Sequence, residues 1–169
     1  MGEEVTLKNE SEESEVKHKI DFDDEGNLIL KEKKKVKMGA KSRAGGGAFE
    51  LRVRKDLIEK GWNVDKWTNN LDLEKNEIIA AKRKMRFINK NMRFMALGTG
   101  FPDFVAFQLM DDETNYRVIG VECKMNGKLS KIEKEKCRWY LKKKTFSEIL
   151  IARKVKEKNR VKVVYDEFE

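Results

Sequence analysis

Histidine, cysteine and proline are scarce in this chain of 169 residues, which contains one His, two Cys and one Pro. The single histidine, His18, stands in a polar N-terminal stretch, so histidine-based catalysis and most zinc sites are excluded from the rest of the chain. The two cysteines, Cys123 and Cys137, lack metal-ligand spacing and lie within apolar patterns. We interpret both as small core residues.

Long apolar runs are also missing. No stretch of eighteen apolar residues occurs, so we expect no transmembrane span and no membrane partner. The N-terminus is acidic, unlike a secretory signal, and the expected location is therefore the cytoplasm. Glutamine occurs once, at Gln108, while Lys and Glu are abundant, a composition typical of a thermophile or a virus of one.

Charge is plentiful instead, at 40% of residues, with a net charge of +8. Residues 1–30 contain ten acids and three lysines and carry −7, which leaves +15 for residues 31–169. A body that basic attracts polyanions, of which nucleic acid is the commonest inside cells. The alternative is that the charge only provides solubility.

The length indicates one domain with a tail. Residues 1–40 are expected to be an acidic, then basic, N-terminal tail that is largely disordered, with a small hairpin over residues 20–37. Residues 41–47 contain three glycines and are predicted to be a flexible basic linker, either a hinge or an arm that grips phosphate. The folded domain is expected to span residues 41–169.

The apolar periodicity of the body predicts an α/β fold with a mixed β-sheet flanked by helices. The predicted elements are a helix over 48–60 ended by Gly61, a strand over 62–67, a helical stretch over 73–81, a hairpin of strands 103–110 and 116–124, a helix over 131–144, and strands over 147–153 and 160–165.

Two short motifs in the predicted hairpin have the residue types of a metal site. Asp103 follows Pro102 at the start of the first strand, and Glu122 and Lys124 stand near the end of the second, on one face with Gly120. Two close carboxylates need a proton or a cation, and Mg²⁺ prefers one or two carboxylates plus waters and phosphate oxygens. We expect Gly120 to leave room for an ion or a phosphate. The alternative is a surface salt bridge between strands.

The predicted helix over 48–60 places a third acid beside its apolar stripe. Glu50 shares that stripe with Val53 and Leu57, so it is expected to face inward. An inward carboxylate needs a cation or hydrogen-bond donors, whereas a solvated one would only complement the helix dipole.

The helix over 131–144 places Lys136 on one face with Ile132 and Trp139. The amine of Lys136 either extends to the rim or contacts the scissile phosphate region. Basic residues interleaved with apolar ones suit nucleic-acid contacts, although they also fit a solvated face. The candidate nucleic-acid-binding residues are Lys41, Arg43, Lys82, Arg83, Lys84, Arg86, Lys90, Arg93, Lys128 and Lys131.

A helix Glu, then Pro-Asp, then Glu-x-Lys, then a further helix resembles the PD-(D/E)xK nuclease superfamily, over roughly residues 42–165. Glu50, Asp103, Glu122 and Lys124 match that pattern position by position. Residues 129–141 are similar to the corresponding loop and helix of archaeal Holliday junction resolvases and of virus-type replication-repair nucleases. Either Glu133 or Lys136 occupies the position of the catalytic residue in that helix.

The resemblance implies a restriction-endonuclease-like core in the order αβββαβ and a metal-dependent DNA endonuclease of repair, recombination or replication. It implies that Asp103, Glu122, the backbone carbonyl of Cys123 and Glu50 hold Mg²⁺ or Mn²⁺, and that Lys124 positions the nucleophile and Lys136 assists. The expected partner is DNA, and a homodimer is expected if two strands are cut symmetrically. Five alternatives stay open: a Holliday junction resolvase, a nuclease of flaps, single strands or ends, a restriction-type enzyme, a non-catalytic nucleic-acid binder, and an unrelated basic protein in which the motifs occur by chance.

Overall fold

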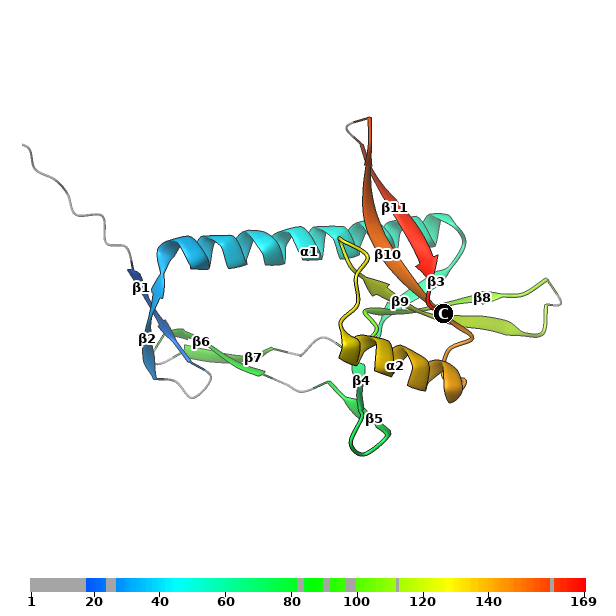
Figure 1. Cartoon of the computed structure of the whole chain (residues 1–169), viewed down its shortest axis with the longest axis horizontal. Coiled ribbons are helices and arrows are strands. Elements are labelled where there is room, and N and C mark those ends of the chain that lie inside the picture. The colour runs from blue at the N-terminus through cyan, green and yellow to red at the C-terminus, as the bar shows by residue number, and fades with distance from the viewer. Residues whose placement is uncertain are drawn as a thin grey trace, which may run out of the picture.

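The computed structural model describes residues 18–23, 27–81, 84–89, 92–96, 100–111, 113–158 and 160–169 (Figure 1). In this part of the chain the helices are α1 (Lys33–Glu59) and α2 (Lys131–Lys142). Neither is long and apolar enough to cross a membrane. The strands are β1 (His18–Phe22), β2 (Leu28–Glu32), β3 (Asn63–Lys66), β4 (Asn69–Asp72), β5 (Glu77–Ala80), β6 (Lys84–Asn89), β7 (Met92–Ala96), β8 (Phe104–Leu109), β9 (Tyr116–Cys123), β10 (Glu148–Glu157) and β11 (Arg160–Glu167).

A five-stranded mixed sheet forms the centre of the fold, in the order β11-β10-β9-β8-β3. The β9–β10 pair is parallel and the other three pairs are antiparallel. The connection between the parallel strands runs through α2, as a parallel pair requires. The predicted mixed α/β class is confirmed, and so is the predicted hairpin of β8 and β9.

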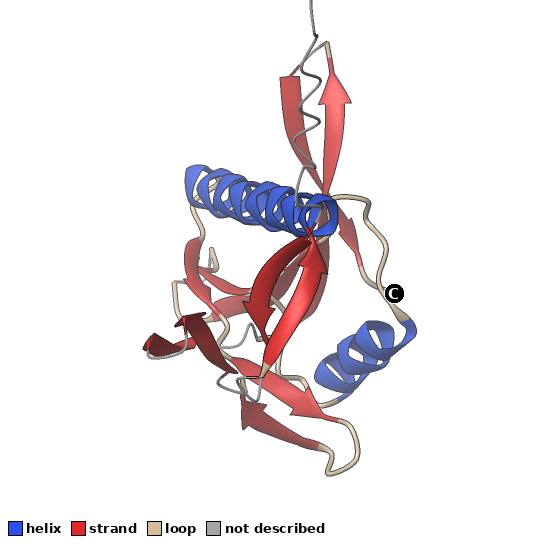
Figure 2. Ribbon diagram, turned by 90° about the vertical axis from the view of Figure 1, so that its left-hand side faces the viewer, coloured by secondary structure: helices blue, strands red, loops and turns tan. Residues whose placement is uncertain are grey.

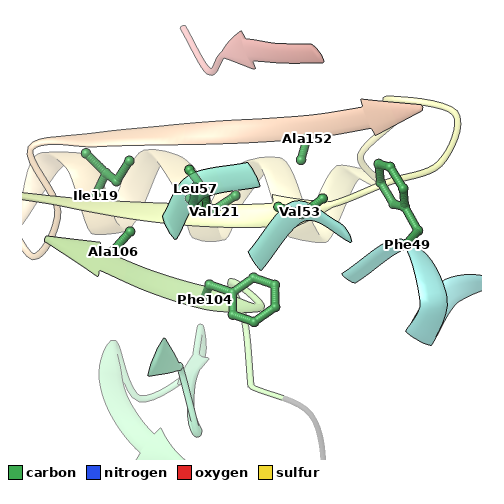
Figure 3. Packing of buried hydrophobic residues seen from close by; sticks show 8 residues of the cluster. All are labelled: Phe49, Val53, Leu57, Phe104, Ala106, Ile119, Val121 and Ala152. Atoms are coloured by element: carbon green, nitrogen blue, oxygen red, sulfur yellow. The ribbon is translucent and has the colours of Figure 1, made fainter. Parts of the chain in front are cut away.

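One face of the sheet packs against the second half of α1. Val53 and Leu57, four residues apart, are almost completely buried and belong to one cluster with Ile119 and Val121 of β9 and Ala106 of β8 (Figure 3). Side chains alternate between the faces of a strand, so Ile119 and Val121 both reach this side. The apolar stripe predicted for the helix is confirmed.

The other face packs against α2, and Figure 2 shows the two helices separated by strands. Cys137 and Tyr140 of α2 are fully buried in a cluster with Phe146 and with Ile149 of β10. The Tyr140 hydroxyl donates a hydrogen bond to the Phe101 carbonyl at 3.0 Å. The sheet therefore has a core on both sides, and α2 is tied to the segment that leads into β8.

The flexible linker predicted for residues 41–47 is wrong, because α1 runs unbroken from Lys33 through these residues. A glycine costs a helix about 1 kcal/mol relative to alanine but does not stop it, and the helix ends only at Lys60, before Gly61 at φ +86°. The hairpin predicted for the N-terminal region is present as β1 and β2. Residues 1–17 lie outside the described residues, so the disordered tail and the division at residue 40 stay predictions.

The helical stretch predicted for residues 73–81 is also wrong, because β4 and β5 pair there as a hairpin. The Asp72 side chain accepts hydrogen bonds from the backbone N–H groups of Glu74 and Lys75, and Asn76 has φ +54°. An Asp side chain that caps its own turn competes with a helix. Leu71, just before the turn, is buried against the α2 side of the core.

Candidate functional site

Asp103 and Glu122 face each other at the end of the β8–β9 pair. The register pairs Phe104 with Val121, and its continuation by one residue brings Asp103 opposite Glu122. The backbone N–H of Cys123 donates to Asp103 Oδ2 at 2.9 Å, which holds the Asp103 side chain across the strand pair. The two acids singled out in the sequence are therefore brought together by one hairpin.

Glu122 is a buried acid with an unsatisfied oxygen. Its exposed fraction is 4%, and its Oε1 lies 3.0 Å from Lys124 Nζ. Its Oε2 is buried and has no hydrogen-bond partner among the described residues. Burial, helped by the negative charge of Asp103, raises the pKa of Glu122 to about 8 in spite of Lys124. A buried oxygen without a partner indicates a missing proton donor or cation.

The pKa of Asp103 is raised as well, first by burial and further by the charge of Glu50. The N–H of Cys123 and the cations Lys66 and Lys124 act in the opposite direction. The acids thus lie in one electrostatic neighbourhood, and two carboxylates so placed favour an added proton or a metal ion.

Lys124 is held between two acids. Its Nζ lies 3.0 Å from Glu122 Oε1 and 2.6 Å from Glu133 Oε1. Partial burial opposes the charge, but the hydrogen bonds and charges of Glu133 and Glu122 outweigh it and raise the pKa of Lys124. Lys124 is therefore a cation at neutral pH, which can donate hydrogen bonds but cannot act as a base.

The start of α2 positions Glu133. Ser130 Oγ accepts a hydrogen bond from the Glu133 N–H at 3.3 Å, and Glu133 Oε2 accepts one from the Ser130 N–H at 2.7 Å. Although partial burial acts against it, the bonds from Lys124 and Ser130 lower the pKa of Glu133. This reciprocal capping box leaves Oε1 free to bind Lys124. The Ser-x-x-Glu spacing is the signal in the sequence from which this geometry could have been found.

Glu50 is partly buried, and its side chain is 30% exposed. Its Oε2 lies 2.5 Å from Nζ of Lys66, the last residue of β3. The same amine lies 4.5 Å from the centre of the Phe104 ring. The cation that an inward Glu50 requires is therefore Lys66, which sequence reasoning missed because the two residues belong to different elements.

Lys136 lies beside the acids but is bound elsewhere. Its Nζ donates to Asn70 Oδ1 of β4 at 2.5 Å and lies 5.7 Å from the Phe101 ring centre. Burial lowers the pKa of Lys136, while Glu133 and Glu122 partly offset the effect. The apolar face predicted from Ile132 is wrong, because Ile132 is 59% exposed. The buried stripe of α2 runs through Cys137 and Tyr140, one position away.

Gly120 does not leave the space predicted for an ion or phosphate. A Cβ built there would lie 2.9 Å from Pro102 Cγ and 3.1 Å from Phe146 Cδ2. The absent side chain makes room for these two rings, because they pack across the strand at that point.

The acids fit a metal that needs few protein ligands. Among the described residues no three His, Cys, Asp or Glu side chains gather as a ready ligand set. Mg²⁺ takes one or two carboxylates and completes its shell with water and phosphate oxygens. Asp103 and Glu122, with the unpartnered Oε2, match that donor set. They do not provide the four ligands that a structural zinc site requires.

The candidate nucleic-acid-binding residues are spread over three places. Lys41 and Arg43 lie exposed on α1, and Lys128 and Lys131 lie exposed on either side of Ser130. The remaining six belong to the β6–β7 region: Lys82, Arg83 and Lys90 lie outside the described residues, and the side chains of Lys84, Arg86 and Arg93 are likewise outside the description.

No protein-family model matches the chain, and neither does any curated protein or solved structure with which it was compared. The case for a function therefore rests on the geometry of the site.

Proposed function

We propose that the chain is a metal-dependent nuclease that hydrolyses phosphodiester bonds in DNA, with a restriction-endonuclease-like core of the PD-(D/E)xK type. One observation carries the proposal. Asp103 and Glu122 are opposed at the end of a strand pair, Glu122 keeps a buried oxygen without a partner, and the protonated Lys124 stands beside it. A purely structural ion pair would satisfy that oxygen.

The metal would be Mg²⁺ or Mn²⁺, held by Asp103, Glu122 and the backbone carbonyl of Cys123, with Glu50 contributing directly or through water. Such an ion, when bound, lowers the pKa of a bound water and polarises phosphoryl oxygens. Asp103 comes to the site already oriented by the Cys123 N–H, so little rearrangement is needed to bind.

Lys124 would stabilise the negative charge that develops on the phosphate. A preorganised cation in a partly buried site acts more strongly than one in water. Glu133 keeps Lys124 charged and oriented through the capping box of α2. Lys136, whose amine is bound to Asn70, would contact the phosphate backbone of the substrate.

The test is cleavage of a labelled panel that contains a four-way junction, a flap, a fork, a single strand and a plain duplex, with Mg²⁺ or Mn²⁺. The variants Asp103→Asn and Glu122→Gln keep size and hydrogen bonding but remove the charge. The matched control is Glu135→Gln, which changes an exposed acid on α2.

We expect each site variant to lower the cleavage rate by more than the roughly 10- to 100-fold that loss of a supporting residue around a metal causes, while the control cleaves like wild type. The preferred substrate would separate a junction resolvase from a flap, single-strand or restriction-type nuclease. Binding of DNA without cleavage in either metal would overturn the proposal in favour of a non-catalytic binder.

A further inference from the structure

The first half of α1 has no core to pack against. The helix has 27 residues, about 40 Å at 1.5 Å per residue, and its buried side chains are Phe49, Val53 and Leu57, all in the second half. No residue from 33 to 48 is buried. Figure 1 shows this half extending past the central sheet toward β1 and β2. We call residues 33–48 the arm.

All charged residues of the arm are basic. The arm contains no acid, and its six cations are Lys33, Lys34, Lys35, Lys37, Lys41 and Arg43. Of these six, Lys35 alone forms an ion pair within the described part of the chain, with Glu32 at 3.0 Å. Lysines at the N-terminus of a helix are disfavoured by the helix dipole, and the first turn has no acid to offset them. Five of the six cations therefore have no ion-pair partner in the described part of the chain, and a polyanion could supply one.

The cations lie on two sides of the arm. Lys33, Lys37 and Lys41 are spaced by four and form one row, with a rise of about 6 Å between neighbours. By helical periodicity this row lies opposite the stripe that α1 buries in the core. Lys35 and Arg43 lie on the other side, where they line a hollow of about 460 Å³ between the arm and β1–β2.

The arm is also slim. Between the cations it carries mainly small residues, and Gly45, Gly46 and Gly47 follow one another directly before its end. A Cβ built on any of these three would have nothing within 4 Å, so packing inside the protein does not require glycine there. A bare helix surface lets another backbone approach closely.

We propose that the outer face of the arm enters the major groove of duplex DNA, where Lys33, Lys37 and Lys41 contact the phosphate backbone, while Lys35 and Arg43 stay on the side of β1–β2. The major groove is about 12 Å wide and admits one α-helix of about 10–12 Å. The groove of A-form RNA is too narrow for this. The choice of DNA rests on the proposed function, but the binding itself needs no cleavage.

The length of the arm determines how much DNA it would contact beside the proposed site. Lys33 precedes Glu50 by seventeen residues, about 25 Å along the helix, which corresponds to about seven base pairs. A substrate must therefore extend about that far on one side of the cleaved bond to contact the whole arm.

The test measures the affinity of the full chain, in EDTA, for a labelled DNA duplex of about 24 base pairs and for an RNA duplex of the same sequence, over a range of salt. The arm variant is Lys33→Gln with Lys37→Gln and Lys41→Gln. The control variant, Lys142→Gln with Lys143→Gln and Lys156→Gln, removes the same charge from exposed lysines elsewhere.

We expect the arm variant to bind DNA about tenfold more weakly near 0.1 M salt and to reduce the slope of log affinity against log salt by about 2 to 3. The control should lose less than about threefold in affinity, and RNA binding should change equally little in both variants.

An unchanged affinity and slope in the arm variant, or an equal loss in the control, would overturn the proposal. An equal loss for RNA would overturn the major-groove part of it. If the wild type cleaves DNA and the arm variant binds normally, the arm proposal fails alone. If binding depends on the arm and no metal supports cleavage, the nuclease proposal fails alone.

Discussion

At the residue scale, Glu122 is the one acid that is buried among the residues the structure describes. The residue is 4% exposed. One carboxylate oxygen forms an ion pair with Lys124, and the other has no hydrogen-bond partner among the described residues. Burying a charge without full compensation destabilises a fold, and proteins tolerate such strain chiefly where it serves a ligand. Lys124 does not compensate fully, because it is shared with Glu133.

The raised pKa of Glu122 predicts how metal-free stability depends on pH. Its ordinary value of 4.5 is raised to about 8 in the fold, so the folded state binds this proton more tightly than the unfolded state does. The contribution to the free energy of unfolding is full below pH 4.5 and is lost as the pH rises to about 8, by on the order of 5 kcal/mol.

Urea unfolding in EDTA at several pH values measures this effect. Glu122→Gln should flatten the loss of stability between pH 4.5 and 8, whereas Glu135→Gln should keep the wild-type profile. A Glu122→Gln profile parallel to wild type would show that another group titrates.

At the element scale, the two halves of α1 differ in the interactions that stabilise the helix. The second half is amphipathic and packs on the sheet. The arm buries no side chain, and within the described part of the chain its one ion pair is that of Lys35 with Glu32. Most helical stability in proteins comes from packing, so the arm depends on its continuity with the packed half.

Two glycines should respond in opposite directions to alanine. Gly46→Ala should raise the free energy of unfolding by up to about 1 kcal/mol, because the new methyl group meets open space and alanine favours the helix. Gly100→Ala should destabilise, because its Cβ would lie 2.0 Å from the Trp67 carbonyl oxygen, which belongs to rigid backbone. Thermal unfolding of both variants measures the difference. A destabilised Gly46→Ala would mean that the helix is interrupted there.

At the scale of the whole molecule, the site lies where both cores meet the end of the sheet. Glu50 comes from the helix on one face, Glu133 from the helix on the other, and Asp103 and Glu122 from the strands between them. A ligand bound among these acids would therefore link all three layers of the fold.

Metal binding should accordingly stabilise the whole fold. At a free Mg²⁺ or Mn²⁺ concentration of about 100 times Kd, the free energy of unfolding should rise by about 2.7 kcal/mol. Thermal unfolding with and without the metal measures this, and Asp103→Asn should abolish the shift while Glu135→Gln retains it. An equal shift in Asp103→Asn would place the metal elsewhere.

Much of the fold follows from local pattern. Alternation in residues 104–109 and 116–123, and the stripe through Val53 and Leu57, predict strands and a helix because each depends on neighbours a few positions away. Local pattern does not predict residues 41–47 and 73–81, where three glycines continue a helix and an Asp-capped turn joins two strands. Local preference is weak there, and neighbouring structure outweighs it.

The chain order and residue types were enough to identify the mixed α/β class and to pair Asp103 with Glu122, because both acids adjoin a short hairpin whose register follows from alternation. Three-dimensional packing was needed for the rest of the site. Some contacts join residues far apart in the chain, such as Glu50 with Lys66 or Lys136 with Asn70. No periodic pattern in the sequence predicts them. They depend on how helices and strands are placed against one another, which is a property of the whole core.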